Sequence, residues 1–308
     1  MDYTSIKLTN LTTNESIVIS DLPENFDLVL EYVDWSQVES SSNYIKYINL
    51  IGERLTSVSL NTREIEIVGW IVATNQENME LKKRNLNRFI NPLQEIQLDY
   101  DRYSINFKPD KSIEYNSQDS SENCDVLCRF LISGTAAIPL FRLTSEDVYR
   151  DTAIQSVPLF PWISPINKGF VFGIMSEYTV SNVMNEGDVD QGFVLRLVAA
   201  HGDVTNPKIT DNKTGKFIQL LLFMNEGDIV EISTETGNKY VHLIQGEQVT
   251  DIFRYVSENS TMSLNLSVGE NDLSITADTN HKNLTATIRF STMRMEHQNY
   301  MKKIANNL

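Results

Sequence analysis

The sequence has little cysteine, and what it has excludes a disulfide framework. Two cysteines occur among 308 residues, Cys124 and Cys128, and a small stapled domain needs more. In a strand-like run their spacing sets them about 13 Å apart on one sheet face, at roughly 3.3 Å per residue, too far for a disulfide. We therefore expect both to pack as reduced thiols, in a chain made in a reducing cytoplasm.

Long apolar runs and positive charge are also scarce. No run approaches the roughly 18 residues that span a bilayer; residues 217–224 are among the longest. The start, MDYTSIKLTN, has neither the basic flank nor the apolar stretch of a secretory signal. Lys and Arg number 26 against 41 Asp and Glu, a net charge of −15. Such a surface repels phosphates and anionic lipids, so we expect no specific nucleic-acid binding and no membrane partner.

Catalytic motifs are missing as well. The sequence contains no nucleophile elbow, phosphate-binding loop, dinucleotide-binding glycine pattern, H-E-x-x-H or kinase signature. Three pairs have the residue types of metal ligands or paired carboxylates: Asp99/Asp101, Asp188/Asp190 and His201/Asp203. A turn role is the simpler interpretation of each pair. The sequence therefore predicts no catalytic, cofactor-binding or metal residue and no enzyme. A hydrolase would need a cleft with carboxylates of shifted pKa.

Tryptophan is scarce too, which bears on sugar binding. Sugar-binding sandwiches stack rings on the sugar, and this chain has Trp35, Trp70 and Trp162. None lies among the C-terminal strands, and Trp70 lies in a dense strand pattern that places it in a core. A carbohydrate-binding or adhesin module is therefore the alternative function; it predicts exposed rings on the sandwich.

What the sequence does contain is a strand pattern in its first half. Ile65, Ile67 and Ile71 alternate with Glu64 and Glu66, which is typical of a half-buried strand. We expect strands at 16–20, 26–33, 63–73, 95–100, 103–108 and 124–133. The prediction for residues 1–134 is a β domain.

One segment of that domain has a helical period instead. Met79, Leu86 and Phe89 are spaced for one face of a helix, with basic residues between them. The pattern predicts an amphipathic helix near 75–91, capped by Thr74 or Asn75 and ended before Pro92. We expect its apolar face to pack on a sheet.

After residue 134 the composition changes. Four prolines fall within 27 residues and disfavour a helix or central strand: Pro139, Pro158, Pro161 and Pro165. We expect residues 135–168 to form an ordered but irregular linker, 169–294 a C-terminal β-sandwich, and 295–308 a polar tail. The expected sandwich strands are 170–178, 192–201, 208–211, 217–224, 229–233, 240–244, 263–267, 272–277 and 284–291.

The order of these features resembles a known family. The first half runs strand, helix, Asn91-Pro92 and hairpin within REIEIVGWIVATNQENMELKKRNLNRFINPLQEIQLDY. The second half has an aromatic strand and then these turn signals: Asn206-Pro207, Lys213-Thr214-Gly215, Gly227-Asp228, Gly237-Asn238 and Gly269-Glu270-Asn271. Over residues 60–133 and 169–291 this order is similar to the distal tail (Dit) family of bacteriophage tail proteins. Residues 1–60 match nothing in it.

The resemblance carries expectations about fold and function. It implies an all-β chain with an N-terminal ring-forming β domain and a C-terminal galectin-like β-sandwich. It implies a structural tail-tip protein, without enzymatic activity, that forms a hexameric ring between the tail tube and the host-recognition baseplate. The implied partners are copies of itself, the tail tube, the tail-associated hub and the receptor-binding protein. The implied location is the virion, after synthesis in the host cytoplasm. Contractile tails, non-contractile tails and bacteriocin-like particles remain open at this point.

Overall fold

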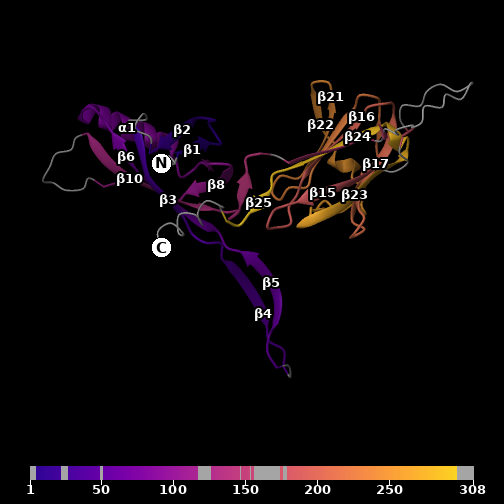
Figure 1. The fold of residues 1–308 in the computed structure, drawn as a ribbon, viewed down its shortest axis with the longest axis horizontal. Helices are drawn as coiled ribbons and strands as arrows, with labels where there is room; N and C mark the ends of the chain where they lie inside the picture. The colour runs from indigo at the N-terminus through magenta and orange to yellow at the C-terminus, as the bar shows by residue number, and fades with distance from the viewer. Residues whose placement is uncertain are drawn as a thin grey trace, which may run out of the picture. The chain divides into compact units, whose positions relative to one another are not determined.

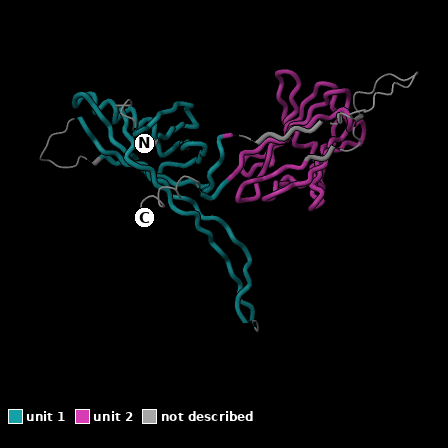
Figure 2. The backbone as a smooth tube through the Cα atoms, viewed as in Figure 1, with its two compact units in different colours: residues 1–144, 294–308 teal, residues 145–293 magenta. Residues whose placement is uncertain are grey.

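The computed structural model divides the chain into two compact units. It describes residues 5–21, 27–48, 51–116, 126–145, 147–152, 154–155, 174–175 and 179–296. Unit 1 contains residues 1–144 and 294–308, and unit 2 contains residues 145–293 (Figure 2). Unit 2 is therefore an insertion in the sequence of unit 1, which the chain leaves after Thr144 and enters again at Arg294.

Unit 1 is built on a ten-stranded sheet with one helix (Figure 1). Its elements are β1 (Ser5–Asn10), β2 (Ser16–Ser20), β3 (Leu28–Trp35), β4 (Ser40–Ile45), β5 (Arg54–Leu60), β6 (Arg63–Val72), α1 (Gln76–Phe89), β7 (Ile96–Tyr100), β8 (Tyr103–Pro109), β9 (Glu114–Asn116), β10 (Leu127–Ala136), β11 (Phe141–Leu143) and, at the return of the chain, β25 (Met293–Arg294). The sheet order is β25-β11-β8-β7-β1-β2-β3-β6-β10-β9, and β4 and β5 form a separate two-stranded sheet.

The ten-stranded sheet closes on itself. Besides its place in that order, β10 pairs with β8, through Gly134 opposite Pro109 and Thr135 opposite Lys108. A Cβ atom on Gly134 would lie 2.7 Å from the carbonyl oxygen of Lys108, so glycine is what allows the two strands to approach. The closed circuit encloses a core whose central strand, β6, buries Ile65, Ile67 and Ile71.

Helix α1 packs on this core as the sequence predicts. Asn75 is its N-cap, and the Asn75 side chain accepts a hydrogen bond from the backbone N–H of Asn78. Met79, Leu86 and Phe89 are buried in the unit 1 core. The predicted helix and its apolar face are confirmed.

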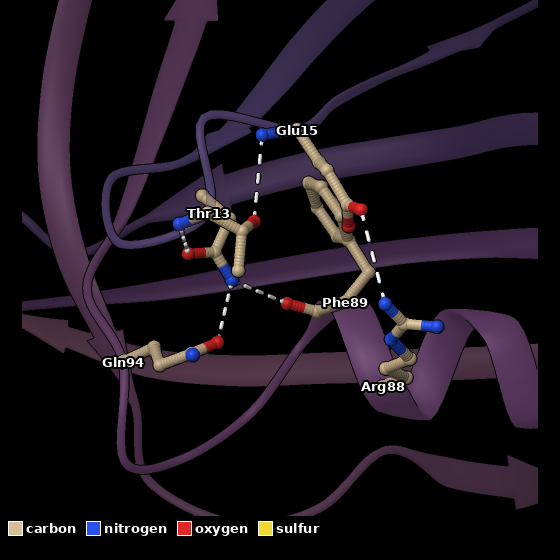
Figure 3. Close-up of polar contacts among 6 residues, drawn as sticks. Thr13, Glu15, Arg88, Phe89 and Gln94 are labelled. Carbon is tan, nitrogen blue, oxygen red and sulfur yellow. Dashed lines mark hydrogen bonds and ion pairs between the residues drawn. The ribbon is translucent and has the colours of Figure 1, made fainter.

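A buried amide fixes the end of the helix. The Asn10 side chain is 1% exposed; its Nδ2 donates to the Phe89 carbonyl at 3.0 Å and to Gln94 Oε1 at 2.7 Å. Its Oδ1 accepts the backbone N–H of Thr13 at 3.2 Å, and Figure 3 shows Thr13, Phe89 and Gln94 converging there. The β1–β2 turn is thus joined to the C-terminal end of α1.

Unit 2 is a two-sheet sandwich. Its elements are β12 (Asp147–Thr152), β13 (Ile154–Gln155), β14 (Ile174–Met175), β15 (Thr179–Asn185), β16 (Val194–Ala199), β17 (Val204–Asp211), β18 (Phe217–Gln219), β19 (Phe223–Met224), β20 (Ile229–Ser233), β21 (Tyr240–Gln245), β22 (Gln248–Asp251), η1 (Phe253–Tyr255), β23 (Gly269–Thr279), η2 (His281–Asn283) and β24 (Leu284–Phe290). One sheet has the order β12-β24-β16-β20-β21-β22, and the other β15-β23-β17-β18 with β19 on β17. Leu195 and Leu197 of the first sheet share one core with Leu273 and Ile275 of the second. The mainly β fold with one helix is confirmed.

Several predicted elements differ from the structure. Strands β1, β4, β5, β15 and β22 were not predicted, and the predicted strand 263–267 has only an isolated bridge between Gln191 and Leu266. The predicted strand 217–224 is wrong as a single element: it breaks into β18 and β19, because Leu220 turns to a bridge with Val256. The predicted linker contains strands β11, β12 and β13 in its described part, and the structure divides after residue 144. Residues 156–168 of the linker, most of the predicted strand 170–178 and residues 297–308 of the predicted tail lie outside the described residues.

Candidate functional site

The acidic candidates noted in the sequence lie in turns or loops, except Asp99, which lies in strand β7. Asp101 has a positive φ of 53° in the β7–β8 turn, and Asp99 accepts a hydrogen bond from Gln97 Nε2 at 2.6 Å. Asp190 accepts the backbone N–H of Val268, and Asp203 that of Glu226, both at 3.1 Å. Within the described residues, no three His, Cys, Asp or Glu side chains gather as metal ligands.

The remaining candidates lie in or near the unit 1 core. Cys128 is buried, while Cys124 and Trp162 lie outside the described residues. Trp35 is buried and makes edge contacts with Tyr100 and Phe141, at ring-centroid distances of 5.5 and 5.2 Å. Trp70, predicted to be core, is only half-buried. Both described tryptophans lie in unit 1, so neither forms a sugar platform on the sandwich.

Hairpin β4–β5 is the most conspicuous surface of unit 1. Figure 1 shows it extending from the rest of the unit, and every residue of both strands is exposed. We call residues 40–60 the arm. Its exposed apolar side chains, with exposed fractions, are Tyr44 57%, Ile45 47%, Tyr47 44%, Ile48 93%, Ile51 108%, Leu55 48%, Val58 56% and Leu60 38%.

Little within the chain holds the arm. Strands β4 and β5 pair from Ser40–Leu60 to Ile45–Arg54, with a register shift at Asn43/Tyr44. Asn43 Nδ2 donates to Ser57 Oγ at 2.9 Å, and Thr56 Oγ1 donates to the Asn43 carbonyl at 2.8 Å. A two-stranded ribbon with no covered face is at most marginally stable in water. A patch of large exposed apolar side chains also marks an interaction site.

Charge distinguishes the arm from the rest of the chain. It contains Lys46, Glu53 and Arg54 and so has a net charge of +1, while the whole chain has −15. Neither strand carries an acidic residue. The arm is therefore suited to an acidic surface that also offers apolar contacts.

Sequence reasoning missed the arm, although a signal was present. Residues 40–60 are rich in Ser, Ile, Leu and Tyr, and Gly52 lies between the two strands. Gly52 has a φ of +96°, a conformation that glycine adopts without strain. These features are typical of a hairpin. Apolar and polar residues do not alternate regularly along it, however, so the sequence does not indicate a face that packs on a core.

Two polar contacts elsewhere, with the pKa shifts that they cause, lie on sheet surfaces, whereas Arg63 is fully buried and burial lowers its pKa. Arg129 forms a two-bond pair with Glu31, at 2.7 and 2.8 Å, and these hydrogen bonds lower the pKa of the Glu31 carboxyl. In unit 2, burial and a 2.8 Å hydrogen bond to Glu231 raise the pKa of Tyr240 to about 12. The arm, with its exposed apolar side chains, is the candidate functional site.

Comparison with known proteins addresses both units. Residues 9–126 match the family model of the phage tail protein RIFT-related domain, and residues 186–293 match that of the siphovirus-type tail component, C-terminal domain. Among curated proteins, none matches the sequence. No helix in the described part of the chain is long and apolar enough to cross a bilayer.

Solved structures of phage proteins share the fold. The crystal structure of phage SPP1 Dit (gp 19.1), described as a paradigm of hub adsorption apparatus in phages that infect Gram-positive hosts, is similar with a TM-score of 0.64 at 12% identity. A chain of the phage P2 baseplate in its activated conformation with Ca is similar with a TM-score of 0.53 at 9% identity. Each alignment covers 94% of this chain and 98% of the other.

Each of the two family models matches a different compact unit, and both models describe phage tail proteins. Together their matched ranges cover more than half of the chain, one in each compact unit. The resemblance noted in the sequence is therefore confirmed. The expectation that residues 1–60 match nothing in the family is wrong, because the first match begins at residue 9. The chain belongs to the siphophage distal tail (Dit) protein family, whose members are structural components of the phage tail.

Proposed function

We propose that this chain assembles with copies of itself into a hexameric ring, and that the ring joins the tail tube to the host-recognition baseplate. The observation that carries the proposal is the arm. In the described part of the arm, eight large apolar side chains are exposed on a ribbon that has no covered face. Burying them on a neighbouring subunit would remove apolar area from water and give the ribbon the support that its own chain lacks.

A second copy of the chain suits the arm because of charge. The ends of β3 and β6 place Asp34 directly opposite Glu66, and both side chains are exposed, as is Glu64 two residues away. Like charges directly opposite on a sheet destabilise it. Lys46 and Arg54 of a neighbour's arm would relieve that repulsion.

The proposed role requires no reaction. Asp190 and Asp203 accept backbone hydrogen bonds, and the family to which the chain belongs consists of structural tail components. We accordingly propose no enzymatic activity, synthesis in the host cytoplasm and a place in the virion. The further proposed partners are the tail tube, the tail-associated hub and the receptor-binding protein.

Electron microscopy and light scattering of the purified full chain test the ring. We expect hollow particles with the mass of six copies. The variant Tyr44→Ser/Ile48→Ser should lose the particles and sediment as a monomer. The matched control is Val249→Ser, which removes an apolar side chain of similar exposure, 59%, from strand β22 of unit 2. Rings from the arm variant, or monomers from the unmodified chain, would contradict the proposal.

A further inference from the structure

Unit 2 carries an exposed apolar surface of its own. We call Leu221, Phe223, Phe253 and Tyr255 the Phe253 patch; their side chains are 52%, 57%, 45% and 36% exposed. Two segments build it: the end of the β18–β19 connection and the short helix η1. Aromatic side chains exposed in this number on a folded domain mark a contact surface.

The patch is held on rigid backbone. Leu220 and Val256 form an antiparallel bridge, flanked by hydrogen bonds from Leu221 N–H to the Tyr255 carbonyl at 2.7 Å and from Ser257 N–H to the Gln219 carbonyl at 2.9 Å. This register places Leu221 opposite Tyr255. Leu220 and Met224 are fully buried, so strand alternation turns Leu221 and Phe223 outward.

One cation lies within the patch. Arg254 is exposed, its guanidinium is 4.9 Å from the centroid of the Tyr255 ring, and its Nη2 donates to the Tyr255 hydroxyl at 3.1 Å. The ion pairs found among the described residues do not include Arg254. In a chain with 41 acidic residues, an arginine without a carboxylate beside four apolar side chains leaves a charge to be matched by a partner.

We infer that the Phe253 patch docks another protein of the tail tip, through apolar side chains that surround a carboxylate. This inference rests on the proposed hub function. Phe, Tyr and Arg are enriched at the centres of protein interfaces, and the carboxylate would pair with Arg254 as the surrounding contacts exclude water.

Other occupants fit the patch less well. A saccharide would find only the Arg254 guanidinium and the Tyr255 hydroxyl as hydrogen-bonding groups beside the rings, while the charge of Arg254 favours a carboxylate; binding to a glycan is an outcome of the test below. An anionic membrane is disfavoured by the net charge of −15. Copies of this chain carry the arm for self-assembly, so the patch is left for a different protein.

Photo-crosslinking in assembled particles tests the inference. Phe253→p-benzoylphenylalanine is introduced into the full chain in phage particles, and crosslinked products are identified by mass spectrometry. We expect a crosslink to a different tail protein, in a segment that contains Asp or Glu beside apolar residues. Arg254→Glu in the same background should lower the crosslink yield at least tenfold, since it places a like charge against the partner's carboxylate. The matched control position is Val249.

Each other outcome overturns the inference. A crosslink between two copies of the chain, or none although the chain is present in the particles, excludes a docked tail protein. Binding to a glycan array that Phe253→Ser abolishes would assign the patch to a saccharide. Failure of the hub function looks different, because the chain would then be absent from purified tails. Arg254→Glu must retain the melting temperature of the unmodified chain for its yield to be interpreted.

Discussion

Two antiparallel strand pairs in unit 1 have the same backbone chemistry and opposite surroundings. Strands β6 and β10 pair over ten residues, and burial alternates along β10 and along the first part of β6. Strands β4 and β5 of the arm also pair through their backbones, yet all their side chains are exposed. Since both strand pairs form their backbone hydrogen bonds, they differ in whether other residues cover their side chains. The β6–β10 pair gains its stability within the chain, while the arm must gain it from another molecule.

Phe89→Ala should have the largest effect on the β6–β10 side of this comparison. Phe89 is 6% exposed in the unit 1 core, so truncation leaves a cavity and should cost about 3–5 kcal/mol in the free energy of unfolding. The control is Arg84→Ala, exposed on the same helix, with a change within about 0.5 kcal/mol. Lys83 is a poorer control because its ammonium lies 5.3 Å from the Tyr115 ring. Urea unfolding measures both, and equal losses would contradict the assignment of the buried face.

Gly69→Ala should have the second largest effect, a loss of about 1–3 kcal/mol in the free energy of unfolding. Gly69 lies in β6, where an added Cβ would meet the Val29 carbonyl oxygen and the Phe130 ring, each at 2.6 Å. In the arm, a Cβ on Gly52 meets nothing within 4 Å, so Gly52→Ala strains only its positive φ and should cost about 1 kcal/mol. Thermal melts of both variants compare the two regions. A larger loss from Gly52→Ala would mean that the arm, and not β6, is closely packed.

Tyr115→Phe should cost about 1 kcal/mol at neutral pH. The Tyr115 hydroxyl donates to Asn87 Oδ1 at 3.0 Å, and burial raises its pKa from 10.0 to about 12. Because the folded pKa is the higher one, the stabilisation is complete below pH 10 and is lost as the pH rises towards 12. The difference in free energy of unfolding between the unmodified chain and Tyr115→Phe should therefore become smaller between pH 10 and pH 12.

Unfolding in urea at pH 8, 10 and 11 measures this pH dependence. Tyr47→Phe, which removes a hydroxyl from an exposed residue of the arm, is the control for the loss of a tyrosine hydroxyl. If the difference in free energy of unfolding between the unmodified chain and Tyr115→Phe stayed constant from pH 8 to 11, the raised pKa of Tyr115 would be ruled out.

The smallest effect on stability should come from the arm itself. Tyr44→Ser/Ile48→Ser removes side chains that are 57% and 93% exposed, so the free energy of unfolding of the monomer should change by less than about 0.5 kcal/mol. Denaturant unfolding at a protein concentration too low for assembly measures it. A loss of several kcal/mol would show that the arm packs on its own chain, and the comparison with β6–β10 would fail.

The sequence by itself determined the elements whose pattern has a single strong period. Ile65, Ile67 and Ile71 alternate in β6, and Met79, Leu86 and Phe89 follow a helical spacing in α1; all six are buried where the pattern places them. Asn75 was also identified as a possible cap. Local propensity and burial agree at these positions, so the pattern suffices. The turn order, likewise local, was enough to indicate the family.

Only the tertiary structure decided the surfaces and the closure of the sheets. The arm has apolar residues on both faces because its cover is not in its own chain, so no alternation marks it. The pairing of β10 with β8 and the return of the chain at Arg294 join residues far apart in sequence. The Phe253 patch likewise depends on the bridge between Leu220 and Val256. Such contacts follow from long-range register, which a local period does not encode.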